Sequence, residues 1–441
     1  MADRYRPAPD VELRHPEWCK NATIYQINTR QFTAEGTFAA AAEQLPRLAA
    51  LGVTVLWLMP VQPIGERNRK GSLGSPYSVR DYDAVNPEFG TAADLRAFVA
   101  AAHDLGLRVI LDWVANHTAW DCTLVDEHPE WYARDHKGDF TPTPWWDWDD
   151  IIDLDYRSPE LRAWMTAAMV RWVSEYDLDG FRCDVAGFVP TDFWENARRE
   201  LEAVKPVLLL AEWESRDLHR AAFDLSYAWS WNEHLHDIAQ GRADVNLLRI
   251  FYSWDLKAWP DDSIRMMFVA NHDHNAWEGT EYERFGDAVG AAIVLSVVGR
   301  GLPLVHNGQE AGLRRRLKFF DRDPIEWRED PMADFYRRLI ALRRDTPALW
   351  SGRWGAHMVD VPNDRPTQVL SFVRSDEHTK VLALFNFSAE PVTALLRDGL
   401  YPGHYRDFAD QRPVELVAGQ PVELPAWGWR VLIGTGAPYV P

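Results

Sequence analysis

Residues 180–184, GFRCD, place an arginine and an aspartate at the end of a short apolar stretch. Residues two apart in a strand point to the same side, so we expect Arg182 and Asp184 to project together from the C-terminal end of a strand. A guanidinium beside an aspartate keeps the carboxylate ionised, and a positioned carboxylate can act as a covalent nucleophile. A structural ion pair fits the same five residues, so the interpretation depends on what recurs elsewhere.

Polar residues also follow other apolar stretches of the chain. DWVANH at 112–117, Glu212 after VLLLA, and NHD at 271–273 each come where a strand is expected to end. In a barrel of parallel strands, all strand ends on one rim face the same pocket. Carboxylates, histidines and an arginine gathered at one rim favour a catalytic site over packing.

Strand and helix patterns alternate along most of the chain. Runs of Val, Leu and Ile that are apolar on both faces are typical of parallel strands buried on both sides. The helices between them carry start and stop signals, such as Thr91 with Asp94 at the start of one helix and Gly106 after its end. The pattern predicts eight strands, at residues 22–27, 53–59, 107–112, 180–184, 207–211, 223–227, 264–271 and 302–306. Eight strands alternating with helices indicate the α/β class and a closed (β/α)8 TIM barrel.

Two segments depart from this alternation. Residues 118–155 are rich in Trp, Pro and Asp and are expected to form a short insertion. From residue 351 the chain changes to short alternating strands, which predict an antiparallel β-sandwich. We therefore expect the barrel at 1–117 and 156–350, the insertion at 118–155 and a C-terminal β-sandwich domain at 351–441.

Composition limits the classes of partner and compartment. The 441 residues contain 47 Lys and Arg against 66 Asp and Glu, a formal charge of −19, which argues against nucleic acid as a partner. No stretch is long and apolar enough for a membrane span or a signal peptide, and Cys19, Cys122 and Cys183 form no metal or redox motif. We therefore expect a cytoplasmic protein that does not bind membranes. The 22 tryptophans point to carbohydrate, because flat aromatic faces can hold sugar rings.

The strand-end motifs resemble a known enzyme family. DWVANH, GFRCD, the glutamate after VLLLA, and VANHD are similar to the signature regions of the alpha-amylase family of glycoside hydrolases, family thirteen, and occur in the same order. The stretch SPYSVRDYDAVNPEFGT is also similar to family sequence. The resemblance covers residues 24–342 and implies that residues 118–155 correspond to a short B domain.

The resemblance and the chemistry of the residues agree on three catalytic roles. Retaining cleavage of a glycosidic bond needs a nucleophile and an acid/base carboxyl group about 5 Å apart. The resemblance implies that Asp184 is the nucleophile, Glu212 the acid/base catalyst and Asp273 the carboxylate that grips sugar hydroxyls in the transition state. The apolar strand before Glu212 is expected to raise its pKa and keep it protonated.

Four further residues are expected to bind substrate or position the nucleophile. The resemblance implies that Arg182 orients Asp184, that His117 and His272 hydrogen-bond sugar hydroxyls, and that Tyr77 stacks under the ring at the cleavage point. Many starch-cleaving members carry a Lys-His pair on the acceptor side, where this chain has Gly187 and Phe188. We therefore expect acceptor binding to differ from that of long-polymer amylases.

A metal site and a tryptophan cluster each have two interpretations. The resemblance implies calcium, with Asn116 and Asp153 as ligands, and the oxygens of these side chains suit calcium. The same two residues can instead hydrogen-bond the loop in place, and both interpretations stay open; no organic cofactor is expected. The tryptophans in PWWDWDD, residues 144–150, fit a sugar platform or the core of the insertion, and the core is the favoured interpretation.

The leading hypothesis is a retaining hydrolase of α-1,4-glucosidic bonds in maltooligosaccharides or short α-glucans. An α-glucan transglycosylase or sugar isomerase on the same scaffold is the alternative, because it would use the same carboxylates. A binding subunit without catalysis is disfavoured, because such a relative should lack one or more of the three carboxylates that this chain keeps. Oligomeric state is left open.

Overall fold

The computed structural model describes residues 11–435. Eight parallel strands form a closed barrel in the order β1-β10-β9-β8-β7-β6-β3-β2. Their bounds are Ile24–Ile27 (β1), Val55–Leu58 (β2), Arg108–Trp113 (β3), Gly180–Cys183 (β6), Leu208–Ala211 (β7), Leu225–Tyr227 (β8), Ile264–Met267 (β9) and Leu302–His306 (β10). The predicted (β/α)8 barrel is therefore confirmed, and the strands lie near their predicted positions except at one end. Strand β9 ends at Met267, so residues 271–273 follow it after a short loop instead of standing at its end.

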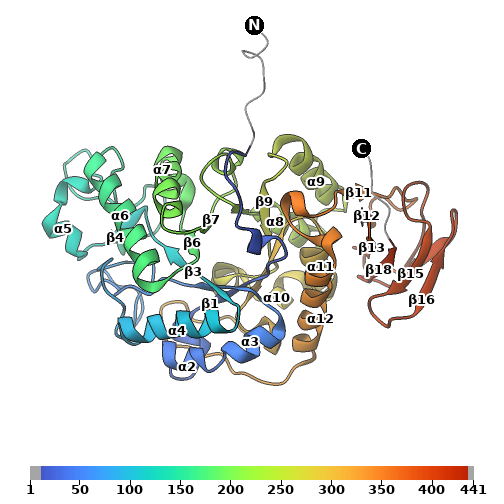
Figure 1. The fold of residues 1–441 in the computed structure, drawn as a ribbon, viewed down its shortest axis with the longest axis horizontal. Coiled ribbons are helices and arrows are strands. Elements are labelled where there is room, and N and C mark those ends of the chain that lie inside the picture. Colours follow the sequence, from blue (N-terminus) through green and yellow to red (C-terminus); the bar gives the residue numbers. More distant parts are fainter. Residues whose placement is uncertain (1–10, 436–441) are drawn as a thin grey trace, which may run out of the picture. The chain divides into compact units, whose positions relative to one another are not determined.

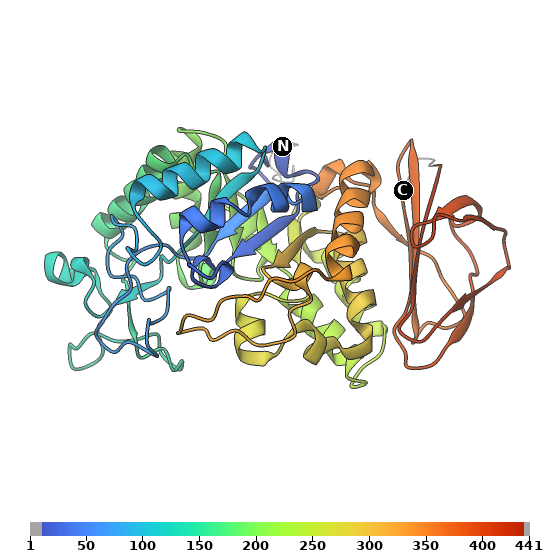
Figure 2. The same ribbon diagram turned by 90° about the horizontal axis from the view of Figure 1, so that it is seen from below.

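Helices follow most of these strands, and their ends carry the expected caps. The main ones are Ala92–Asp104 (α4), Pro159–Tyr176 (α6), Thr191–Glu202 (α7), Trp229–Ala239 (α8), Asn246–Ala258 (α9), Val289–Val298 (α11) and Pro331–Asp345 (α12). Thr91 and Asp94 form a capping box at the start of α4, and the side chain of Ser158 caps α6. Helix α4 packs against β3 and against α2 (Phe38–Ala42), along the outer side of the first barrel strands (Figure 1; Figure 2).

The predicted insertion contains one small sheet. Strand β4 (His117–Ala119) pairs antiparallel with β5 (Ile151–Asp153), and the segment between them holds α5 (Thr123–Glu127) and loops. His117 lies directly opposite Asp153 in this sheet. The pairing therefore ties both ends of the insertion together next to β3.

The C-terminal strands form the expected antiparallel sandwich. One sheet has the order β11-β12-β13-β18-β15-β16, and a second consists of β14 and β17. The bounds are Met358–Asp360 (β11), Val369–Ser375 (β12), Thr379–Asn386 (β13), Val392–Leu395 (β14), Gly403–Asp407 (β15), Pro413–Leu416 (β16), Pro421–Leu424 (β17) and Trp429–Thr435 (β18). Val373 and Leu382 of the larger sheet share one buried core with Ala394 and Val422 of the smaller sheet.

Contacts divide the chain into two compact units. The first is built mainly of Ile24–Tyr227 and His306–Ala333, and the second mainly of Ala228–Val305 and residues 334–435. The proposed domain boundaries at residues 117/118, 155/156 and 350/351 stay predictions. Within residues 11–435, no helix combines the length and the apolar character needed to cross a bilayer.

Candidate active site

Arg182 is the centre of a buried cluster of carboxylates in the first unit. Its Nη1 lies 2.8 Å from Oδ1 of Asp112 and 2.8 Å from Oδ1 of Asp184, and its Nη2 lies 2.9 Å from Oε1 of Glu212. Strands β3 and β6 pair in register so that Asp112 lies beside Arg182, while Asp184 and Glu212 directly follow β6 and β7. The expected pairing of Arg182 with Asp184 is therefore present, and two further carboxylates share the same guanidinium.

The surroundings of Glu212 differ from the apolar setting expected from its strand. The preceding residues, Leu208–Ala211, are buried and apolar. The carboxylate itself lies against Arg182, and its Oε2 accepts a hydrogen bond of 2.8 Å from the backbone N–H of Val185. Both contacts favour the ionised form. The strand before Glu212 is apolar, but the groups that contact its carboxylate, Arg182 and Val185, come from the end of the adjacent strand β6.

Val185 holds its N–H toward Glu212 at a conformational cost. Its φ is +36°, which is a left-handed conformation and is unfavourable for a β-branched residue. The residue directly follows Asp184, so the strained turn lies between the two carboxylates. Strain of this kind is typical of positions where function sets the backbone geometry.

The cluster carries more negative than positive charge. Burial raises the pKa of Asp112 to about 6, with Arg182 acting in the opposite direction and Glu212 adding to the rise. Oδ2 of Asp112 also accepts hydrogen bonds from the hydroxyl of Tyr77 at 2.9 Å and from Nε1 of Trp57 at 3.1 Å. Three carboxylates around one guanidinium titrate as a group, and the group keeps a proton into the weakly acidic range.

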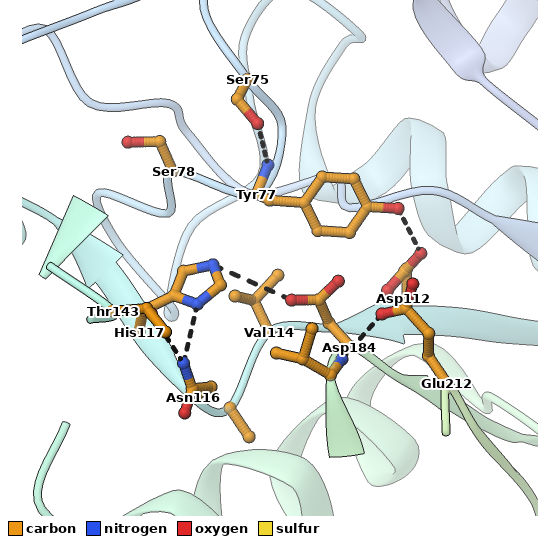
Figure 3. Close-up of polar contacts among 12 residues, drawn as sticks. Ser75, Tyr77, Ser78, Asp112, Val114, Asn116, His117, Thr143, Asp184 and Glu212 are labelled. Atoms are coloured by element: carbon orange, nitrogen blue, oxygen red, sulfur yellow. Dashed lines mark hydrogen bonds and ion pairs between the residues drawn. The ribbon is translucent and has the colours of Figure 1, made fainter. Parts of the chain in front are cut away.

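His117 and Tyr77 lie beside Asp184, as Figure 3 shows. Nε2 of His117 is 3.8 Å from Oδ2 of Asp184, and burial lowers the pKa of the imidazole to about 4. The ring is therefore neutral at neutral pH and can hydrogen-bond a sugar hydroxyl without carrying charge. The ring of Tyr77 stacks at 6.2 Å on Phe319 while its hydroxyl reaches Asp112.

Asn116 and Asp153, the two proposed calcium ligands, are joined by hydrogen bonds. Nδ2 of Asn116 lies 3.2 Å from Nδ1 of His117, 3.5 Å from Oγ1 of Thr143 and 3.3 Å from Oδ1 of Asp153. Thr143 in turn donates to Oδ1 of Asp153 at 2.5 Å. These contacts turn the amide nitrogen of Asn116, which cannot bind calcium, toward Asp153. The arrangement fits the hydrogen-bonded alternative, and calcium binding stays a prediction.

His272 and Asp273 belong to the second unit. Nε2 of His272 lies 3.3 Å from Oδ2 of Asp273, and Asp273 directly precedes a π-helical turn, His274–Glu278. His272 is buried, while the carboxylate of Asp273 is about one-third exposed. The other seven predicted site residues all belong to the first unit.

Two aromatic residues that hold Arg182 were missed from the sequence. The hydroxyl of Tyr227 accepts from Nε of Arg182 at 3.2 Å, and the guanidinium lies 5.2 Å from the ring centroid of Trp57. Tyr227 ends β8 and Trp57 is the penultimate residue of β2. Their position at strand ends was a usable signal, because large polar aromatics there face the same rim as the carboxylates.

Two family models match this chain. The model described as alpha amylase, catalytic domain, matches residues 20–330, and the model described as maltogenic amylase, C-terminal domain, matches residues 360–431. The first model alone covers more than half of the chain.

Similar proteins include hydrolases and a transferase. The chain is 27% identical over 419 residues to an alpha-amylase of Haloarcula japonica, covering 89% of this chain and 60% of that relative. It is 23% identical to a maltogenic alpha-amylase of Bacillus acidopullulyticus, over 95% of this chain and 78% of the relative. It is also 27% identical to an alpha-1,4-glucan:maltose-1-phosphate maltosyltransferase of Pseudomonas aeruginosa, over 96% of this chain and 69% of the relative.

Among solved structures, a maltogenic alpha-amylase from Thermotoga neapolitana superimposes with a TM-score of 0.86 at 31% identity, covering 94% of this chain and 99% of that chain. An alpha-amylase from Lactobacillus plantarum superimposes with a TM-score of 0.83 at 30% identity, with the same coverage.

Proposed function

Because this chain belongs to the alpha-amylase family, we propose that it is a retaining glycoside hydrolase that cleaves α-1,4-glucosidic bonds in maltooligosaccharides and short α-glucans. The observation that carries the proposal is the sharing of Arg182 by Asp184 and Glu212. Two carboxyl groups on one guanidinium lie close together, as the retaining mechanism requires.

The reaction assigns a separate task to each carboxyl group. Asp184, held ionised by Arg182, attacks the anomeric carbon, and the bond to the leaving oxygen breaks as Glu212 gives that oxygen a proton. Glu212 then removes a proton from water, which attacks the glycosyl-enzyme and releases Asp184.

The remaining predicted residues bind the substrate. Neutral His117 is placed to hydrogen-bond a hydroxyl of the ring attached to Asp184, and the ring of Tyr77 offers an apolar face beside it. Asp273 and His272 are proposed to bind sugar hydroxyls, most tightly in the distorted transition state. We also propose a cytoplasmic location, which the three free, buried cysteines support.

Transfer to a sugar acceptor is the second candidate. The similarity to the maltosyltransferase supports it, and the reaction would use the same carboxylates. A product profile on maltoheptaose, cyclodextrin, sucrose and soluble starch separates the two. Shorter products with the α-anomeric configuration would support hydrolysis, whereas products longer than the substrate, or an isomerised disaccharide, would support transfer or isomerisation.

Substitution tests the assignment of the nucleophile. We expect Asp184→Asn to lower kcat on maltoheptaose by roughly 10³-fold or more. Asp192→Asn, at an exposed carboxylate near the start of α7, serves as the matched control and should keep wild-type turnover. Wild-type activity in Asp184→Asn would disprove the mechanism.

A further inference from the structure

The second unit contains a pocket that none of the proposed site residues lines. Its volume is about 340 Å³, which is enough for a small organic molecule. One part of its wall is helix α9, which contributes Tyr252, Ser253 and Leu256, and another part is the β11–β12 region of the larger sandwich sheet (Figure 1). All residues that line the pocket belong to the second unit. The pocket is therefore a candidate site separate from the cluster around Arg182.

The sheet side of the pocket has buried arginines next to it. Met358 of β11 and Phe372 of β12 line the pocket, and Arg374 lies directly opposite Met358 in the sheet, two residues beyond Phe372. Residues two apart in a strand share a face, so Arg374 lies on the face of the sheet that carries the pocket. Arg343 lies close to it, because both guanidiniums donate to the backbone oxygen of Leu349.

These two arginines carry charge that the protein does not neutralise. Both are buried and donate to backbone oxygens and one hydroxyl, and neither pairs with a carboxylate within residues 11–435. Burial lowers the pKa of Arg343 and of Arg374 to about 9, and the charges of Arg343 and Arg300 add to the lowering at Arg374. Both guanidiniums are therefore still protonated at neutral pH, in a chain whose formal charge is −19.

Arg300 lines the pocket and keeps part of its hydrogen-bonding capacity. Its Nη2 donates to the backbone oxygen of Asp261 at 3.0 Å, and its Nε lies 3.4 Å from Oδ2 of Asp255. Its Nη1 makes no hydrogen bond or ion pair with the residues that the structure describes. Asp255 also lies 3.3 Å from Nη1 of Arg265, so two guanidiniums share this carboxylate. Arg300 can therefore donate to an anion in the pocket.

The remaining lining residues leave the positive charge in place and add apolar surface. Among the described residues that line the pocket, Asp360 is the one carboxylate, and Nη1 of Arg249 holds it at 2.7 Å. Leu256, Met358 and Phe372 form an apolar part of the wall. An inorganic ion would leave this apolar surface uncovered, whereas an organic anion would bury it.

We propose that this pocket binds a small organic phosphate, with the phosphate group on Arg300 and Ser253 and the organic part against Leu256 and Met358. A phosphate monoester carries a charge of about −1.5 to −2 at neutral pH, and a guanidinium matches the geometry of its oxygens. The organic part is a sugar or a nucleoside, since both offer apolar faces with polar edges. The pocket shares no residue with the candidate active site, so the proposal does not depend on the proposed function.

Isothermal titration calorimetry of the full chain with glucose 1-phosphate and with AMP tests the proposal and distinguishes the two sources of the phosphate. We expect at least one of these probes to bind with a Kd roughly tenfold or more below that of inorganic phosphate, because only an organic phosphate covers the apolar wall. Arg300→Gln should raise this Kd roughly tenfold or more, since it removes the charged donor. Ser253→Phe should abolish binding, because it fills the pocket while Arg300 stays intact.

The matched control is Arg242→Gln, which removes an exposed arginine paired with Asp237 and should leave the Kd unchanged. Thermal unfolding of each variant near the wild-type temperature shows that it is folded. Binding of glucose 1-phosphate alone would assign the pocket to sugar phosphates, and binding of AMP alone would assign it to nucleotides. The proposal would be overturned if neither probe binds, or if Arg300→Gln and Ser253→Phe both leave the Kd unchanged.

Discussion

Arg182 sets the charge balance of the candidate site. Its two terminal nitrogens contact three carboxylates, and the rings of Trp57, Tyr77 and Tyr227 lie around its guanidinium at 5.2 to 5.7 Å. The group is fully buried, so every charge that it faces interacts through a medium less polar than water. The protonation state of any one carboxyl group therefore depends on the other two.

Replacing Asp112 should change how stability depends on pH. Burial raises the pKa of Asp112 to about 6, whereas an aspartate in an unfolded chain has a pKa near 4. Between these values the folded protein holds a proton that the unfolded chain has released, so the free energy of unfolding falls as the pH rises through this window. Asp112→Asn should remove this fall, which is on the order of 3 kcal/mol.

Urea unfolding of the wild type and the variant from about pH 4 to pH 7 measures the effect. Asp104→Asn, which changes an exposed carboxylate at the end of α4, is the control and should keep the wild-type slope. A variant that keeps this slope would show that Asp112 does not hold the proton.

At the scale of elements, the short strands β6 and β7 position Asp184 and Glu212, which directly follow them. Strand β6 has four residues, and its register with β7 pairs Gly180 with Leu208. Gly180 has a φ of +145°, and a Cβ atom there would lie 1.9 Å from the backbone oxygen of Leu208. The first residue of β6 must therefore be glycine for the strand to approach β7 and to bring Arg182 next to Glu212.

A methyl group at Gly180 should separate the two strands. We expect Gly180→Ala to lower the free energy of unfolding by about 3 kcal/mol or more, because backbone atoms have to move. Gly138 also has a positive φ, +88°, but a Cβ atom there would meet nothing within 4 Å among the described residues, so Gly138→Ala should cost only about 1 kcal/mol. Urea unfolding of both variants measures the difference, and equal costs would contradict the role of the β6–β7 approach.

At the scale of the whole molecule, the second unit joins the C-terminal sandwich to the later barrel elements. Arg374 of β12 is buried and donates to the backbone oxygens of Gly299, Leu349, Trp350 and Ala356. Burial lowers the pKa of this arginine to about 9. The sandwich is therefore attached through hydrogen bonds that a separately folded module would not need.

Removing these donors should destabilise the second unit. We expect Arg374→Met, which keeps much of the volume but donates no hydrogen bond, to lower the free energy of unfolding by about 3 kcal/mol or more. The side chain of Arg365 is exposed and donates one hydrogen bond, of 3.4 Å, to the backbone oxygen of Thr393 among the described residues, so Arg365→Met should change stability by less than about 0.5 kcal/mol. Thermal unfolding compares the two; an Arg374→Met protein as stable as the wild type would show that the bonds do not hold the sandwich.

The sequence by itself determined the barrel, the C-terminal sandwich and the strand-end positions of Arg182, Asp184 and Glu212. Apolar runs of strand length, helix caps and the motifs DWVANH, GFRCD and VANHD are local features, and each depends on residues close together in the chain. The pairing of Arg182 with Asp184 is also a local feature, because the two residues lie two positions apart at the end of one strand.

Only the tertiary structure decided which groups meet. Glu212 receives the N–H of Val185 from 27 positions away, and Asp112 meets Arg182 from 70 positions away. The exposure of Trp145 and Trp146 likewise depends on the path of the insertion, and the prediction that they form its core is wrong. A local sequence pattern predicts whether a residue lies in a strand and which face of it the side chain occupies. Its contact partners depend on strand register and on the path of the loops, and both are set by contacts between segments that are distant in the sequence.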